Sequence, residues 1–196
     1  MRSWLFHPVI FYPLAAILAA GAILISLQPQ AWPRPPAAVE GRTDQGVVVL
    51  DGEALGAPTG DRAQSYRVVR DFLGRGEALR IAQLPGQPPP AGSDAGVQIA
   101  FAPTLAAALA NRPVQVEVTY RPLPVNAASA LAVRMTGESQ GLWVTRTTPP
   151  QAARVRFELP AQASIDGLGL RAISSGTDQS YGLEIIRIRI RPLAAD

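Results

Sequence analysis

The chain has 196 residues, a length that suits one ordinary domain plus a short additional segment. It contains no cysteine, which excludes disulfide bonds, thiolate metal sites and a cysteine nucleophile. The formal net charge is +3 and every cation is an arginine, a usage that indicates GC-rich codon bias rather than a nucleic-acid partner.

The first long apolar run extends from Val9 to Leu27 and carries no charge. As a helix it would span about 28 Å, close to the ~30 Å hydrocarbon core of a bilayer. A cleaved signal peptide is the alternative, but the run is longer than a typical signal core and no good cleavage site follows it. We therefore predict a short cytoplasmic tail over residues 1–8 and an uncleaved single-pass transmembrane helix over residues 9–27. The remainder would lie outside the cytoplasm, at a bacterial-type inner membrane.

Prolines dominate the stretch after this run. Residues 28–46 include Pro29, Pro33, Pro35 and Pro36 and few large apolar side chains. Proline-rich sequence favours an extended, semi-rigid conformation. We predict a spacer between the helix and a folded domain.

From residue 47 onward, apolar and polar residues alternate with a period of two, which predicts β-strands. Prolines bracket these runs, as expected for residues that cannot donate to a sheet. Strands are predicted at 47–50, 66–71, 78–84, 97–102, 114–123, 130–136, 142–147, 154–159, 167–172 and 183–191, with one short helix at 104–111. The pattern predicts an all-β domain over residues 47–193, an antiparallel two-sheet sandwich of the jelly-roll type.

The alternation also assigns side chains to the core. Inward positions are predicted at Val114, Val116, Val118, Tyr120, Leu131, Val133, Met135, Val155, Phe157, Leu159, Ile186, Ile188 and Ile190.

Three segments together resemble the jelly-roll carbohydrate-binding modules and the wider galactose-binding-like sandwiches. They are "LAAALANRPVQVEVTYR", "LAVRMTGESQGLWV" and "IDGLGLRAISSGTDQSYGLEIIRIRI". The resemblance implies that an aromatic side chain could stack on a sugar, with Trp143 first and Tyr66 and Tyr181 after it. It also implies a structural calcium for which Glu184 is the one matching acidic residue. A lone tryptophan in a sandwich is also commonly a core residue.

Arginines mark the outward positions of several predicted strands. Arg187, Arg189 and Arg191 alternate with isoleucines near the C-terminal end, Arg154 and Arg156 share another strand face, and Arg134 is expected to point outward on a third. If these strands are neighbours in one sheet, the guanidinium groups would form a field suited to carboxylate or phosphate groups. Acidic polysaccharide and lipid headgroups are the corresponding ligands. The alternative is an ordinary solvated sheet face, neutralised by Glu117 and Glu158.

Catalysis has little support in the sequence. The single histidine, His7, lies before the predicted domain, and no phosphate-binding motif is present. We therefore expect a non-enzymatic protein without a cofactor or metal, namely a membrane-anchored extracytoplasmic module that binds glycan or acidic polysaccharide. The alternative is a non-catalytic scaffold subunit that contacts protein partners in a cell-envelope assembly.

Overall fold

The computed structural model describes residues 7–26, 37–60, 64–86, 96–139, 141–176 and 178–193. The chain divides into two compact units, residues 1–33 and residues 34–196. The first contains helix α1 (Pro8–Ser26), and the second contains every strand that the described residues form.

Helix α1 does not support the predicted membrane anchor. It ends at Ser26, and Pro13 lies inside it. Within the described residues, no helix is both long and apolar enough to cross a membrane. The transmembrane helix predicted from Val9 to Leu27 is therefore unsupported, and Leu27 itself lies outside the described residues.

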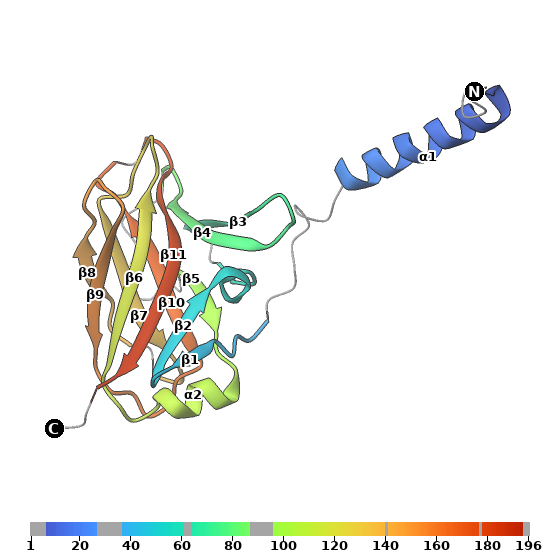
Figure 1. Ribbon diagram of the computed structural model, residues 1–196. Coiled ribbons are helices and arrows are strands. Elements are labelled where there is room, and N and C mark those ends of the chain that lie inside the picture. Colours follow the sequence, from blue (N-terminus) through green and yellow to red (C-terminus); the bar gives the residue numbers. More distant parts are fainter. Residues whose placement is uncertain are drawn as a thin grey trace. The chain divides into compact units, whose positions relative to one another are not determined.

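The second unit is a sandwich of two antiparallel sheets, which confirms the predicted all-β architecture (Figure 1). The larger sheet comprises β1 (Arg42–Asp44), β2 (Val47–Asp51), β3 (Gln64–Arg70), β4 (Gly76–Gln83), β6 (Val114–Pro122), β9 (Ala153–Leu159) and β11 (Tyr181–Pro192). The smaller sheet comprises β5 (Val97–Ala100), β10 (Gly167–Ile173), β7 (Ala130–Thr136) and β8 (Val144–Thr147). A 3₁₀ helix, η3 (Gly52–Leu55), follows β2, and helix α2 (Pro103–Leu109) follows β5.

Strand β11 organises the larger sheet. On one side it pairs with β6 from Leu183 to Pro192. On the other side its first half pairs with β4 and its second half pairs with β2. Strand β9 then pairs with β6, and β3 with β4.

A bulge in β11 corrects one core prediction. The register with β6 shifts between Ile185 and Arg187, so one extra residue enters the strand at Ile186. Ile186 is consequently only partly buried, and Ile185 fills the core in its place. The strict alternation predicted over the three isoleucines fails at this residue because a bulge reverses the inward and outward positions before it.

The remaining predicted core is confirmed apart from Val155, which is only partly buried and packs against it. The inward residues of β6 and β7 and Phe157 of β9 are at most 1% exposed. A buried amide also links the sheets: Gln64 of β3 donates from Nε2 to the carbonyl oxygen of Ala172 and accepts from its backbone N–H, both at 3.1 Å. Because β5 pairs with β10 only as far as Leu170, this side chain takes the place of a missing strand neighbour.

Two elements differ in position from the sequence-based expectation. Strand β1, Arg42–Asp44, lies inside the segment predicted as a spacer and pairs with β2. Helix α2 begins one residue earlier than predicted, at Pro103, where the fixed φ of proline suits the first helical turn.

Candidate functional site

The outward surface of the larger sheet carries many charged side chains, and we call it the basic face. Strand alternation and register place on it nine arginines, Arg42, Arg67, Arg80, Arg121, Arg154, Arg156, Arg187, Arg189 and Arg191, and five acidic residues, Asp44, Asp51, Glu117, Glu158 and Glu184. Nine cations against five anions leave an excess of four positive charges. The basic face includes every arginine of the predicted row except Arg134.

The middle of the basic face is organised by one carboxylate. Glu184 of β11 lies directly between Arg80 of β4 and Arg121 of β6 in the sheet register. Each arginine donates from two side-chain nitrogens to one carboxylate oxygen of Glu184. The nitrogen–oxygen distances are 3.0 and 2.5 Å for Arg80 and 2.9 and 2.5 Å for Arg121. Glu184 is buried beneath them, whereas the two arginine side chains are 43% and 57% exposed.

This arrangement fixes the ionisation of Glu184. Burial raises the pKa of its carboxyl, but the hydrogen bonds from Arg80 and Arg121 and their positive charges outweigh burial and hold the pKa below its usual value. The same contacts do not favour Glu184 as the calcium ligand that the resemblance implies, because both of its carboxylate oxygens already accept hydrogen bonds from guanidinium groups. Among the described residues, no group of three or more potential ligands could hold a metal ion.

Carboxylates also engage three of the predicted arginines. Glu117 accepts a hydrogen bond from Arg156 at 3.0 Å and lies 3.9 Å from Arg154. Asp51 accepts one from Arg187 at 3.1 Å and lies 3.6 Å from Arg42. The predicted neutralisation through Glu117 is therefore present for the arginines of β9.

Three arginines of the basic face differ from these. In the part of the chain that the structure describes, no ion pair or side-chain hydrogen bond engages Arg67, Arg189 or Arg191. Arg189 lies beside Glu117 in the register, but that carboxylate is directed to the arginines of β9.

A cleft of about 430 Å³ opens beside the basic face. Residues 37–42 form one side of it, and Val49, Asp51 and Glu53 are among the residues that complete it. Asp51 is the residue that Arg187 binds, so the cleft adjoins the charged row of β11. Gly41, with φ +67°, lines the cleft, and a Cβ there would approach the Val48 side chain to 2.8 Å.

Arg134 does not belong to the basic face. It lies on β7 in the smaller sheet, and it is 1% exposed rather than outward in solvent. The prediction failed because the sheet to which a strand belongs depends on long-range pairing that local alternation does not contain.

Trp143 explains the burial of Arg134. The guanidinium carbons of Arg134 and of Arg171, on β10, lie 4.5 and 4.0 Å from the centre of the Trp143 ring. Such distances are typical of cation–π contacts. Trp143 is half-buried, its indole Nε1 is buried, and its neighbour Leu142 is the residue that projects into solvent. The ring therefore serves first to cover two buried arginines.

The other aromatic candidates lie elsewhere. Tyr66 is exposed on β3, and Tyr181 begins β11 with its hydroxyl donating to Asp178 at 2.8 Å. The structure does not bring either of them together with Trp143 in a described contact. No aromatic platform therefore gathers around the predicted tryptophan within the described residues.

Several members of the basic face were not predicted. Arg42, Arg67, Arg80 and Arg121 were not proposed as site residues, and neither was Arg171 beneath Trp143. Each lies at an outward position of a strand, which is the signal available in the sequence. What alternation alone could not supply was the order β3–β4–β11–β6–β9 that aligns them.

No protein-family model matches the sequence, and no curated protein matches it either. Among solved structures, the chain is similar to the one described as "BiXyn10A CBM1 APO", at 13% identity and a TM-score of 0.46, covering 79% of this chain and 99% of that one. It is also similar to a carbohydrate binding module of Cellvibrio mixtus lichenase 5A in complex with cellotriose, at 14% identity and a TM-score of 0.42, covering 75% and 100%.

A third similar structure is the N-terminal CBM22-1-CBM22-2 tandem domain of Paenibacillus barcinonensis Xyn10C, at 13% identity and a TM-score of 0.44. It covers 81% of this chain and 47% of the tandem. At these identities and scores the likeness assigns no ligand and no residue role. The sandwich itself rests on the strand pairing described above.

Proposed function

We propose that this chain is a non-catalytic binding module whose ligand is an acidic polysaccharide, bound across the basic face. The observation that carries the proposal is the pair Arg189 and Arg191, which project from β11 without an ion pair among the described residues while their neighbours are fixed by carboxylates. A guanidinium group offers a planar fork of donors that matches a carboxylate. A row of guanidinium groups on a flat sheet therefore suits a polymer that carries a carboxylate on each repeating unit.

The surrounding charges favour a polyanion over a neutral sugar. The excess of four positive charges attracts an acidic chain, and Arg80 and Arg121 expose about half of each side chain while Glu184 holds them in place. Side chains held in this way lose little further freedom when a ligand binds. The adjoining cleft supplies a concave surface for a sugar ring.

The test compares one double variant with one single-site control. Arg189→Ser with Arg191→Ser removes the two available forks, and Arg146→Ser on β8 of the other sheet is the matched control. Retention of the full chain is measured on polygalacturonate and on neutral cellulose at low and moderate salt. Loss of both charge-assisted contacts should weaken polygalacturonate binding by at least about tenfold, and the wild-type interaction should weaken with salt. Equal retention of the double variant and the control would refute the proposal.

A second candidate is a scaffold subunit that contacts envelope proteins. It is favoured by Trp143, whose ring packs on Arg134 and Arg171 instead of forming an open stacking platform. Binding to a purified envelope protein that survives Arg189→Ser and Arg191→Ser, without binding to either polysaccharide, would favour this function.

We also propose the location that the sequence predicts, with the sandwich held by the N-terminal segment on the outer side of a bacterial-type inner membrane. The support comes from the sequence, in which the run from Val9 to Leu27 carries no charge. A reporter enzyme that works only after export, fused behind Asp196, should be active. The chain should also remain with the membrane fraction after alkaline extraction, and recovery in the soluble fraction would refute the attachment.

A further inference from the structure

A row of charged side chains crosses four strands of the basic face. In the sheet register, Arg67 of β3 lies directly opposite Arg80 of β4. Arg80 in turn lies opposite Glu184 of β11, which lies opposite Arg121 of β6. Residues directly opposite each other in an antiparallel pair point to the same face, with Cα atoms about 4.5 to 5.5 Å apart. We call these four residues the transverse row, and its three arginines and one glutamate leave an excess of two positive charges.

Glu184 holds Arg80 in place without using all of its donors. Arg80 donates to the carboxylate through Nε and Nη2, and its Nη1 group takes no part in that contact. The Arg80 side chain is nearly half exposed, and Arg67 is exposed as well. The β3 end of the transverse row therefore carries two adjacent guanidinium groups on the surface, one of which Glu184 orients.

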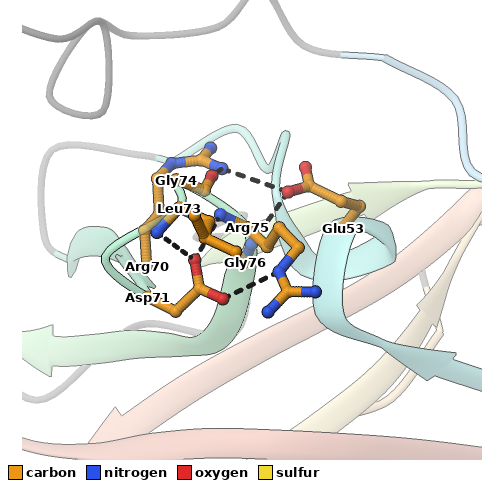
Figure 2. Close-up of polar contacts among 7 residues, drawn as sticks. All are labelled: Glu53, Arg70, Asp71, Leu73, Gly74, Arg75 and Gly76. Atoms are coloured by element: carbon orange, nitrogen blue, oxygen red, sulfur yellow. Dashed lines mark hydrogen bonds and ion pairs between the residues drawn. The ribbon is translucent and has the colours of Figure 1, made fainter. Parts of the chain in front are cut away.

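Contacts in the loop of the β3–β4 hairpin fix the register that places Arg67 opposite Arg80, and Figure 2 shows them. Asp71 Oδ1 accepts hydrogen bonds from the backbone N–H groups of Leu73 and Arg75, both at 2.9 Å. Asp71 Oδ2 accepts a third from Arg75 Nε at 2.8 Å. The two strands therefore leave the loop with a defined alignment.

Strand β3 is also attached to its surroundings on both sides of Arg67. Near the loop, Glu53 of η3 accepts hydrogen bonds from the Gly76 N–H at 2.8 Å and from Arg70 at 3.4 Å. At the other end of the strand, the amide of Gln64 binds the backbone of the smaller sheet. Arg67 lies between these attachments, so its backbone position is fixed before any ligand arrives.

The Arg67–Arg80 pair is electrostatically unfavourable by itself. Like charges directly opposite each other destabilise a sheet. The other arginines of the hairpin avoid this, because Arg70 and Arg75 each contact a carboxylate. An anion between Arg67 and Arg80 would remove the repulsion and accept charge-assisted hydrogen bonds from both guanidinium groups.

We propose that Arg67 and Arg80 form a subsite for the phosphate monoester group of a phosphorylated saccharide. A phosphate monoester carries about −1.5 to −2 charges at pH 7 and has three strong acceptor oxygens. Its charge therefore matches the excess on the transverse row, whereas a singly charged carboxylate or sulfate ester would neutralise only half of it. Its three oxygens can accept from both guanidinium groups at once.

This inference rests on the proposed function and deepens it, because it places a phosphate on the acidic polysaccharide that the basic face would bind. Glu184 and Arg189 are five residues apart on β11, which corresponds to about 16 Å of extended strand. An oligosaccharide of several units spans that distance. It would place a phosphate on the transverse row and carboxylates on Arg189 and Arg191.

The test follows the binding of glucose 6-phosphate to the full chain by phosphorus NMR titration. Arg67→Ser is the informative variant, since Arg67 makes no side-chain contact among the described residues and its removal leaves Glu184 in place. Loss of one of the two guanidinium groups should weaken binding by at least about tenfold. Arg146→Ser, at an exposed position on β8 of the other sheet, is the matched control and should bind as the wild type does. Circular dichroism verifies that both variants are folded.

The pH dependence distinguishes a doubly charged ligand from a singly charged one. The second pKa of a phosphate monoester is about 6, so the doubly charged form predominates at pH 7.5 and is lost toward pH 5. Glu184 stays ionised over this range because its pKa lies below its ordinary value of 4.5, and the arginines remain protonated. The affinity for glucose 6-phosphate should therefore fall several-fold between pH 7.5 and pH 5. Glucose 6-sulfate, added as a competitor, should compete weakly and equally at both pH values.

Each outcome bears on a stated part of the proposal. Equal binding by the wild type and Arg67→Ser, or no binding of glucose 6-phosphate, refutes the subsite. Glucose 6-sulfate that competes at full strength at pH 7.5 refutes the phosphate assignment, and inorganic phosphate that binds more tightly than the sugar ester refutes the saccharide. If polygalacturonate is retained but glucose 6-phosphate is not bound, the subsite alone is refuted. If glucose 6-phosphate is bound but polygalacturonate is not retained, the proposed function is refuted and the subsite stands.

Discussion

Replacing Glu184 by glutamine should destabilise the sandwich, because it removes the one carboxylate between two arginines. The amide can accept from only one guanidinium group, and its NH₂ would face the donors of the other. Loss of one partner of a buried ion pair costs about 3–5 kcal/mol. Arg80 and Arg121 are about half exposed and can recover hydration, so we expect a smaller cost than this, about 2–3 kcal/mol.

The measurement is urea and thermal unfolding of the full chain followed by circular dichroism. For a domain of this size, a loss of 2–3 kcal/mol lowers Tm by about 5–10 °C. Glu158→Gln is the matched control, since Glu158 is a glutamate on the same face for which no ion pair occurs among the described residues. The control should change the free energy of unfolding by less than about 0.5 kcal/mol. If Glu184→Gln is no more destabilising than the control, the ion pairs of Glu184 with Arg80 and Arg121 contribute nothing to stability and the reasoning is wrong.

Three further outcomes follow from the same contacts. Because the folded-state pKa of Glu184 lies below its ordinary value of 4.5, the unfolded chain binds the proton more readily than the folded chain. The difference in free energy of unfolding between wild type and Glu184→Gln should therefore be complete above pH 4.5 and become smaller as the pH falls below it. Urea unfolding at a series of pH values measures this difference. Val118→Asp should abolish cooperative unfolding because it places a charge in a fully buried position, whereas Thr119→Asp on the outward side of the same strand should fold. Gln64→Ala should cost about 2–3 kcal/mol, because it leaves the N–H and C=O of Ala172 without their side-chain partner, and amide exchange at Ala172 should accelerate.

Much of the sandwich could be predicted because alternation and proline placement are local properties. Strand β7 was predicted with its observed bounds, and the inward residues of β6 were all correct. Ile186 could not be placed, because a bulge depends on the register of two strands and not on the composition of one.

The candidate site was less predictable for a related reason. Arg187 and Arg189 were correctly expected on one side of a strand, and Arg154 and Arg156 on another. Whether each of these arginines is paired depends on carboxylates of other strands, such as Asp51 for Arg187. The burial of Arg134 also depends on strands far apart in the sequence. Pairing within the smaller sheet places it beneath Trp143 instead of in solvent.

The position of β11 has a consequence for how the molecule is made. Among the described strands this one comes last in the sequence, yet β2, β4 and β6 all pair with it. During synthesis those three strands emerge first and must wait with open edges until residues 181–192 leave the ribosome. The larger sheet therefore closes only after β11 has been translated, so its assembly depends on contacts between residues that are far apart in the sequence.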